Sequence, residues 1–342
     1  MEELKSLKDL KKVTVSGDRL YSATHEEILS GYTTDVYFLR TMDILDRLGL
    51  KNKVVTAEIF ARKKGILAGI EEAIGVLKNK KVEIWAMPEG TSFEAKETIM
   101  RIRGPYSEFG IYETVILGML ASSSGWATAA AEAKAASKGK PLLCFGARHV
   151  HPAVAPVMER AALVGGADNA SCILGAKLYG KEPVGTVPHA AFLIAGDTLE
   201  VALAYDEITP PDEAITILVD TFKDEAEESI RVAQALGKRL YGIRLDTPGE
   251  RGGVTVELVK EVRARLDQRG FNHVKIVVSG GLYPEKISEL ADYVDAFGVG
   301  SYISGAHPID MTMDIKEVEG QPIAKRGRIP GIIDNDKLVK VK

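Results

Sequence analysis

Apolar runs of strand length recur through the second half of the chain and alternate with helical patterns. The runs cover residues 141–148, 171–175, 184–193, 214–221, 240–246, 274–280 and 294–300. Helical periodicity between them is clearest at 224–236, 255–269 and 284–290. Strands that are apolar almost throughout are buried on both faces, which is typical of parallel strands covered by helices. The pattern predicts an α/β protein with a distorted seven-stranded (β/α) barrel.

The remaining segments have other patterns. The first hundred residues mix helical periods at 43–50 and 66–77 with strand-like runs at 82–86 and 98–103. An alanine- and serine-rich segment, 108–138, is predicted to form one or two packed helices that bridge two domains. The tail from 308 to 342 alternates like a strand, and we expect it to return to the N-terminal sheet. The predicted domains are an α+β domain of residues 1–110 with 305–342, and an α/β barrel of residues 111–304.

Composition narrows the class of protein. The 342 residues are 45% hydrophobic and 27% charged, as in ordinary soluble globular proteins. A net charge of −4 gives no bulk basic field, so we expect no nucleic acid partner. The N-terminus does not resemble a signal peptide, and no apolar run approaches the roughly 20 residues of a membrane span. We therefore expect a cytoplasmic protein without a membrane partner.

Two cysteines, Cys144 and Cys172, are too few for a disulfide framework or a four-thiolate zinc site. Both lie in apolar stretches and are interpreted as small buried hydrophobic residues. His149 and His151 have a spacing that suits a metal in an extended chain, but no third ligand lies nearby. A loop role or contacts with phosphate are favoured over a zinc site, and no zinc is expected.

Polar residues gather where the predicted strands end. In a barrel of this kind, chemistry gathers at the carboxyl ends of the strands. Six of the seven predicted strands carry polar or glycine-rich motifs there. These motifs are Phe145-Gly-Ala-Arg148, Gly185-Thr-Val-Pro-His189, Asp220-Thr221, Arg244-Leu-Asp246, Ser279-Gly-Gly281 and Gly298-Val-Gly300-Ser301. They predict a functional site on this edge of the barrel.

The last two motifs predict a phosphate site, because Gly280, Gly281, Gly298 and Gly300 expose backbone amides without side chains. Asp220 and Asp246 are predicted to hold Mg²⁺ through water. The alternative for this pair is a salt bridge with Arg244 or Arg148. Asp168, which precedes the second strand, is either a helix cap or a carboxylate that faces the ligand.

His189 follows Pro188 at the end of the third predicted strand. A histidine in an apolar strand is more often a satisfied core residue than a catalyst. Its position among the polar strand ends shifts the interpretation toward a site residue.

As an ordered set, these motifs resemble the nicotinate phosphoribosyltransferase family of type II phosphoribosyltransferases. The resemblance also includes Thr34-Asp-Val-Tyr37, Pro88-Glu-Gly-Thr91 and Gly165-Gly-Ala-Asp168, and it covers nearly the whole chain. It implies transfer of phosphoribosyl from phosphoribosyl pyrophosphate (PRPP) to nicotinate, giving nicotinate mononucleotide, a precursor of NAD, and pyrophosphate. It also implies a homodimer or higher homo-oligomer with shared active sites, in which the N-terminal region of one subunit closes the site of another.

The resemblance further implies a role for each matching residue. Phe145 and Tyr37 of the partner subunit would stack on the two faces of the pyridine ring. Arg148, Arg244 and Asp168 would bind substrate, the arginines at the 5′-phosphate or the ring substituent. Asp220 and Asp246 would meet ribose hydroxyls and Mg²⁺, with the four glycines around the phosphate. His189 matches a phosphorylated histidine that couples ATP hydrolysis to transfer, although Ala190 and Ala191 stand where many relatives carry polar residues.

Alternatives remain within this class and outside it. Quinolinate, with two carboxylates, should require a denser cationic pocket than Arg148, Arg244 and a nearby histidine provide. Nicotinamide would need a carboxylate that accepts hydrogen bonds from its amide group, and Asp168 is the candidate. A barrel aldolase or isomerase acting on a sugar phosphate would need a Schiff-base lysine or a pair of general bases on the strands. A relative that binds nucleotides without catalysis is the last alternative.

Overall fold

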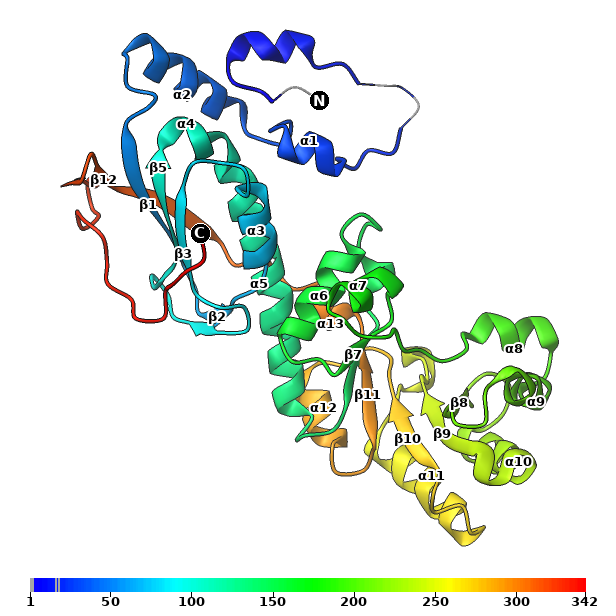
Figure 1. Ribbon diagram of the computed structural model, residues 1–342. Coiled ribbons are helices and arrows are strands. Elements are labelled where there is room, and N and C mark those ends of the chain that lie inside the picture. Colours follow the sequence, from blue (N-terminus) through cyan, green and yellow to red (C-terminus); the bar gives the residue numbers. More distant parts are fainter. Residues whose placement is uncertain (1–2, 16, 18) are drawn as a thin grey trace. The chain divides into compact units, whose positions relative to one another are not determined.

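The computed structural model describes residues 3–15, 17 and 19–342, and the chain forms two compact units (Figure 1). The first unit comprises Met1–Thr128 with His307–Lys342, and the second comprises Ala129–Ala306. Helix α5 (Glu113–Ala136) begins in the first unit and ends in the second. The units therefore divide in the middle of the predicted bridging segment, whereas the sequence placed the boundary near its start, at residues 110/111.

The first unit is built on a six-stranded sheet in the order β13-β12-β1-β5-β3-β14. Its strands are β1 (Val54–Ala61), β3 (Glu83–Ala86), β5 (Thr98–Pro105), β12 (Met311–Val318), β13 (Gln321–Pro322) and β14 (Val339–Lys340). The tail strand β12 pairs antiparallel with β1, and β14 pairs with β3. The predicted return of the tail to the N-terminal sheet is confirmed.

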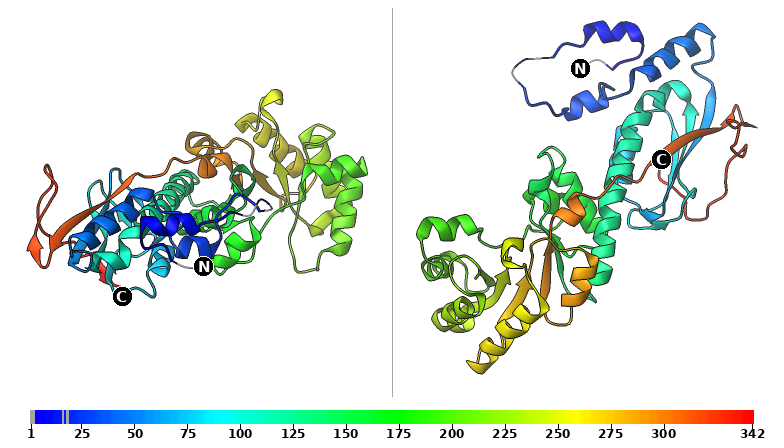
Figure 2. Two further views of the ribbon diagram at one scale, coloured as in Figure 1. Left: turned by 90° about the horizontal axis from the view of Figure 1, so that it is seen from above. Right: turned by 180° about the vertical axis from the view of Figure 1, so that it is seen from behind.

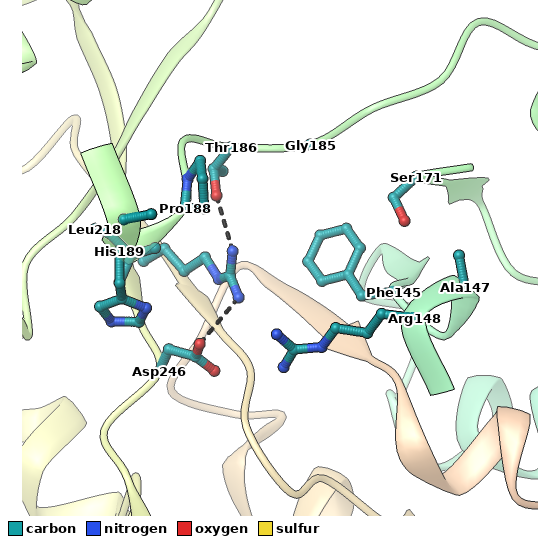
Figure 3. Close-up of a pocket in the computed structure, with 12 residues that line it drawn as sticks. Phe145, Ala147, Arg148, Ser171, Gly185, Thr186, Pro188, His189, Leu218 and Asp246 are labelled. Carbon is teal, nitrogen blue, oxygen red and sulfur yellow. Dashed lines mark hydrogen bonds and ion pairs between the residues drawn. The ribbon is translucent and has the colours of Figure 1, made fainter. Parts of the chain in front are cut away.

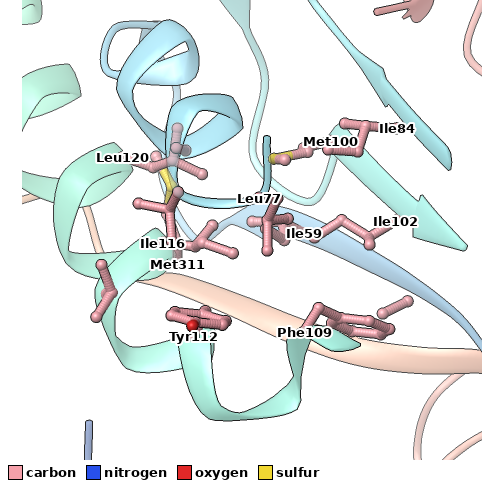
Figure 4. Packing of buried hydrophobic residues seen from close by; sticks show 14 of the residues in the cluster. Ile59, Leu77, Ile84, Met100, Ile102, Phe109, Tyr112, Ile116, Leu120 and Met311 are labelled. Carbon is pink, nitrogen blue, oxygen red and sulfur yellow. The ribbon is translucent and has the colours of Figure 1, made fainter. Parts of the chain in front are cut away.

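Helices and a small hairpin complete the first unit. They are the 3₁₀ turns η1 (Leu7–Lys12) and η2 (Gly110–Tyr112), the helices α1 (His25–Leu29), α2 (Val36–Arg47), α3 (Ile70–Val76) and α4 (Tyr106–Phe109), and the pair β2 (Gly65–Ile66) with β4 (Ser92–Phe93). The core joins fully buried residues of the sheet, such as Ile59 and Ile84, to Tyr112 on η2 and Ile116 on α5 (Figure 4). Helix α3 and strands β3 and β5 confirm the elements predicted over this region.

The second unit contains a six-stranded, fully parallel sheet in the order β7-β6-β11-β10-β9-β8. Its strands are β6 (Leu142–Cys144), β7 (Asn169–Ala170), β8 (Ile215–Leu218), β9 (Leu240–Leu245), β10 (Lys275–Val278) and β11 (Ala296–Val299). Strands β7 and β8 lie at the two edges, so the sheet forms an open half-barrel (Figure 2). The predicted α/β fold with a barrel-like parallel sheet and a separate α+β domain is confirmed.

Helices connect these strands. They are α6 (Ala155–Val164), α7 (Ile173–Leu178), α8 (His189–Ala195), α9 (Thr198–Ile208), α10 (Glu225–Leu236), α11 (Val256–Gln268), α12 (Pro284–Leu290) and α13 (Ser301–Ser304), with the 3₁₀ turns η3 (Ala147–His149), η4 (Gly237–Arg239) and η5 (Gly249–Arg251). The three helices predicted at 224–236, 255–269 and 284–290 are confirmed as α10, α11 and α12.

One of the seven predicted strands is wrong and another is misplaced, and the sheet has six strands. The run at 184–193 is an extended segment followed by helix α8, which begins at His189 after Pro188. A proline cannot donate to a central ladder, and the following Ala-Ala-Phe-Leu-Ile-Ala favours a helix. The run at 171–175 is also misplaced, because the short strand β7 precedes it and α7 begins at Ile173. Periodicity alone cannot separate a short buried strand from a buried helix.

One helical stretch, Tyr106–Ala136, is long and apolar enough to cross a membrane by length and composition, where the sequence led us to expect none. Half of its most apolar window, 50%, is buried inside the protein. Burial of this kind is typical of the core helix of a globular protein.

Candidate active site

A cavity of about 530 Å³ lies at the carboxyl ends of the parallel strands in the second unit (Figure 3). Its lining includes five residues predicted for the site and two polar residues outside that prediction. The predicted ones are Phe145, Arg148, His189, Arg244 and Asp246, and the others are Ser171 and Thr186. Three of the six strand-end motifs, far apart in the sequence, therefore converge on one cavity, whereas Asp220 and the four predicted glycines are not among its lining residues. No lysine is among its lining residues within the described chain, so a Schiff-base aldolase has no candidate nucleophile here.

Arg244, on β9, is the best-anchored cation of the cavity, with a side chain only 15% exposed. Its Nε donates to Ser279 at 2.8 Å, one terminal nitrogen donates to Thr186 at 2.8 Å, and the other pairs with Asp246 at 3.2 Å. Burial lowers the pKa of Arg244, and the Asp246 carboxylate opposes that shift. The salt bridge weighed as an alternative for Asp246 is therefore present, with Arg244 as the partner.

Phe145 packs against this network. The Arg244 guanidinium carbon lies 5.2 Å from the centre of the Phe145 ring, a cation–π contact that occupies part of one ring face. A Cβ on Gly298 would overlap the same ring. A Cβ on Gly300 would come within 2.8 Å of His149 Cε1 and 3.0 Å of the Phe145 carbonyl oxygen. These two glycines thus have a packing reason, in addition to the phosphate contact predicted for them.

The other predicted glycines follow β10. Gly280 has a φ of +85°, which favours glycine, and a Cβ there would lie 2.9 Å from the Asp246 carboxylate. Gly281 also has a left-handed φ, +59°. This turn lets the chain pass close to Asp246, whose carboxylate accepts a hydrogen bond of 2.8 Å from the Ser279 hydroxyl.

His189 and Asp220 form a second polar pair at the same edge. The His189 Nε2 lies 3.3 Å from Asp220 Oδ2, and the Asp220 side chain is only 1% exposed. Burial raises the pKa of Asp220, while His189 opposes the shift. The second oxygen, Oδ1, is buried without a hydrogen-bond partner among the described residues. Asp220 therefore has one oxygen ready for a ligand or a cation.

Arg148 differs from Arg244 because its guanidinium makes no hydrogen bond or ion pair with the described part of the chain, and its side chain is exposed. It extends from the 3₁₀ turn after β6 toward the space that Asp246 also faces (Figure 3). It is the cavity's uncommitted permanent cation.

Asp168 lies outside the candidate site. Its carboxylate pairs with Lys134 at 2.6 Å and accepts a hydrogen bond of 2.7 Å from the Leu142 N–H. Leu142 is the first residue of β6, at the end of the strand opposite the cavity. The predicted substrate contact of Asp168 is therefore wrong for this arrangement, and so is its use as the acceptor for a nicotinamide amide.

The remaining predicted residues have local partners. Tyr37 belongs to the first unit, in the first turn of α2, where it is 53% exposed and its ring centre lies 4.4 Å from that of Phe38. His149 Nδ1 lies 3.1 Å from the Ser304 hydroxyl, and His151 Nδ1 accepts a hydrogen bond from the Ala153 N–H. Both histidine side chains thus make hydrogen bonds that stabilise the loop after β6.

No group of three or more histidine, cysteine or acidic residues that could enclose a metal ion occurs among residues 3–15, 17 and 19–342. Mg²⁺ usually uses only one or two carboxylates and completes its shell with water and substrate phosphates. Asp220 Oδ1, next to the lining residue His189, is a carboxylate oxygen without a hydrogen-bond partner among the described residues and fits such an ion.

Family models match most of the chain. The N-terminal domain of quinolinate phosphoribosyl transferase matches residues 35–124, and the C-terminal domain of the same family matches residues 126–314. The crystal structure of nicotinate-nucleotide pyrophosphorylase from Pyrococcus furiosus is 48% identical, with a TM-score of 0.88 over 92% of this chain and 82% of that chain.

Two further proteins are similar to this chain. A nicotinate phosphoribosyltransferase of Mycobacterium tuberculosis is 28% identical over 340 residues, which cover 87% of this chain and 75% of that protein. Human nicotinic acid phosphoribosyltransferase is 20% identical, with a TM-score of 0.70 over 87% of this chain and 77% of that chain. At that identity the human structure shows only the shared fold.

Proposed function

Since the chain belongs to the quinolinate phosphoribosyl transferase family, among the type II phosphoribosyltransferases, we propose that it transfers phosphoribosyl from PRPP to the ring nitrogen of nicotinate. The products would be nicotinate mononucleotide, a precursor of NAD, and pyrophosphate. The observation that carries the choice of substrate is the single uncommitted arginine of the cavity, Arg148, beside the ring of Phe145.

Charge favours nicotinate over quinolinate. Arg244 already uses three of its five N–H donors on Thr186, Ser279 and Asp246, and its charge is paired with Asp246, so it is a weaker partner than Arg148 for a substrate carboxylate. Arg148 is then left to pair with one carboxylate, and a guanidinium forms bidentate hydrogen bonds with such a group. Quinolinate carries two adjacent carboxylates, and the second would meet the neighbouring Asp246 rather than a free cation. Names among the similar proteins include both nicotinate phosphoribosyltransferase and nicotinate-nucleotide pyrophosphorylase, so the assay below must separate the two substrates.

Nicotinamide is less well supported. Its amide hydrogens would need a carboxylate acceptor near Arg148. The Asp168 carboxylate instead pairs with Lys134 and accepts a hydrogen bond from the Leu142 N–H, outside the cavity. Asp246 is paired with Arg244 and Ser279.

Catalysis in this site would depend on positioning and charge. Loss of pyrophosphate leaves positive charge on the ribose, so stabilising that charge matters more than a strong base. Asp246 lines the cavity and Asp220 contacts the lining residue His189, and their carboxylates would stabilise the developing charge or hold ribose hydroxyls. Mg²⁺, when bound with PRPP, would supply positive charge that helps the pyrophosphate to leave. Asp220 Oδ1 would hold it, and backbone amides near Gly280, Gly281, Gly298 and Gly300 would bind phosphate.

His189 supports coupling to ATP. If its Nε2–H donates to Asp220, the lone pair of Nδ1 is free to attack the γ-phosphorus of ATP. The bond between that phosphorus and the ADP oxygen breaks, ADP leaves, and water later hydrolyses the phosphorus–nitrogen bond. A phosphohistidine here adds about two negative charges beside the cavity. In His189→Ala, stimulation by ATP and labelling from γ-phosphate-labelled ATP should both be lost while slow transfer persists.

A shared site between two copies would complete the ring-binding pocket. Tyr37 is exposed in the first unit, and Tyr37 of the partner subunit would stack on the ring face opposite Phe145. Tyr37→Ala and Phe145→Ala should each be poorly active alone. Mixing the two variants should restore activity, because half of the sites in hybrid dimers are intact. No recovery in mixtures shown to exchange subunits would contradict a shared site.

The central test measures mononucleotide and pyrophosphate formed from PRPP with nicotinate, nicotinamide or quinolinate, with and without ATP. Turnover with nicotinate, stimulated by ATP, is expected. Turnover with quinolinate alone, with release of carbon dioxide, would overturn the substrate while keeping the reaction class. Ligand binding without pyrophosphate release from any base would indicate a relative that only binds nucleotides.

A further inference from the structure

A buried carboxylate outside the strand-end motifs lies beside the wall of the cavity. Glu159, on α6, has no solvent exposure (0%). Its Oε1 accepts hydrogen bonds of 3.1 Å from both the Ala147 N–H and the Ser171 hydroxyl. Its Oε2 accepts a hydrogen bond of 2.5 Å from the Cys172 N–H.

The donors belong to two separate loops of the cavity. Ala147 lies in the turn after β6, between Phe145 and Arg148, and it lines the cavity with both of them. Ser171 and Cys172 follow β7, and Ser171 lines the cavity from that side. One carboxylate therefore ties the loop that carries the proposed ring-binding and carboxylate-binding side chains to the neighbouring loop.

Other buried acids in the protein have a different environment. Glu58, Glu225 and Glu228 are each at most 2% exposed, and each pairs with an arginine. Glu159 instead accepts from two main-chain N–H groups and a hydroxyl. Burial raises the pKa of Glu159, and these hydrogen bonds oppose the shift. A buried carboxylate held by loop amides fixes the position of those loops. Glu58 also accepts from a main-chain N–H, that of Ile333, but its charge is paired with Arg101.

The hydroxyl of Ser171 is oriented by the same contact. A serine has one hydroxyl proton, and here it is donated to Glu159, so only the oxygen lone pairs remain for the cavity. The charged acceptor strengthens all three hydrogen bonds, because bonds to an ionised group are roughly twice as strong as neutral ones.

We propose that Glu159 is a positioning residue that sets the place of Phe145 and Arg148 for the pyridine substrate by anchoring the loops after β6 and β7. This inference rests on the proposed phosphoribosyl transfer. It assigns to Glu159 no contact with the substrate, because Glu159 acts through Ala147, Ser171 and Cys172.

The test compares Glu159→Gln with Glu228→Gln. Glutamine keeps the size of the side chain, but only its carbonyl oxygen can accept, so its NH₂ group opposes one of the donors. Glu228 is a matched control, since it is also fully buried (0%) in the second unit but pairs with Arg231 on α10. Glu159→Gln should raise KM for the pyridine base by about tenfold or more, the loss of one charge-assisted contact, with KM for PRPP changed less than about twofold.

Glu228→Gln should lower Tm without that selective change in KM. If Glu159→Gln merely lowers Tm and scales kcat and both KM values together, or matches the control, the positioning role is overturned.

A measurement on the wild-type protein keeps the inference testable if Glu159→Gln fails to fold. Hydrogen exchange of the Ala147 and Cys172 amides should be strongly protected, although both lie in loops at the cavity. Rapid exchange of both amides would overturn the anchoring. Protected amides without turnover of any pyridine base would refute the proposed function and leave the anchoring intact, so the two failures can be told apart.

Discussion

Replacing Arg148 by methionine tests the choice of substrate most directly, because this change removes the uncommitted cation and keeps an unbranched side chain of similar length. One hydrogen-bonded contact to a charged group contributes about 1.5–3 kcal/mol. At about 1.4 kcal/mol per factor of ten, its loss should raise KM for nicotinate by about 10- to 150-fold.

Stability should hardly change in this variant. The Arg148 side chain is exposed and has no partner in the described part of the chain, so its loss breaks no native contact. We expect the free energy of unfolding to move by less than about 0.5 kcal/mol. Arg265→Met, which removes a half-exposed arginine that pairs with Glu261 on α11, is the matched control for loss of a surface guanidinium.

The assay is steady-state transfer at saturating PRPP, with nicotinamide as a competing ligand that has the same ring but no carboxylate. Arg148→Met should weaken nicotinate and leave the inhibition constant of nicotinamide nearly unchanged. An unchanged KM for nicotinate would refute the pairing of Arg148 with the substrate carboxylate. Equal weakening of both ligands would show that the arginine supports the shape of the pocket instead.

Three further predictions address packing and charge. Gly298→Ala places a Cβ into the ring of Phe145, the residue proposed to stack on the base, and overpacking of this kind costs about 1–3 kcal/mol, so Tm should fall and KM for the base should rise. An unchanged KM for the base would show that the Phe145 ring does not contribute to substrate binding. Burial, with Asp314 adding to it, raises the pKa of Glu113 to about 7. The neutral form therefore stabilises the fold fully below its unfolded value of 4.5, and that stability is lost as pH rises through about 7. Glu113→Gln should accordingly raise Tm at pH 8 and flatten this dependence, and a lower Tm at pH 8 would contradict it. Arg101→Met leaves Glu58, 1% exposed, without its ion pair, and should cost about 3 kcal/mol in urea unfolding, whereas the exposed pair of Arg103 with Glu83 should contribute less than about 1 kcal/mol.

The sequence predicted the parts of the fold whose periods are long and regular. Helices α10, α11 and α12 and the return of the tail to the N-terminal sheet follow from such patterns, and the type II phosphoribosyltransferase class follows from the order of the strand-end motifs. The segment before α8 was misread because a short apolar run suits a strand or a helix equally well. Pro188 was the available signal against a central strand.

The sequence predicted those residues of the candidate site that lie at or directly after the ends of strands. Arg244 lies near the end of β9 and Asp246 directly follows that strand, so their meeting in the cavity follows from local chain geometry. The contacts of Arg244 with Thr186 and Ser279 join different loops, and no spacing in the sequence indicates them. Asp168 was misplaced because its motif fixes the residue type but not which end of the sheet the carboxylate serves.

The first unit is built from two segments of the chain, one before and one after the second unit in the sequence. This order has a consequence for synthesis on the ribosome. Thr56 on β1 hydrogen-bonds to Glu317 on β12, and 261 positions separate them in the sequence. Strand β1 leaves the ribosome long before its neighbour, with one edge unpaired until the whole of the second unit has been made. Unpaired strand edges and contacts between distant residues slow folding and expose a chain to aggregation. The catalytic unit can therefore acquire its parallel sheet during translation, and the first unit is completed only when the last strands emerge.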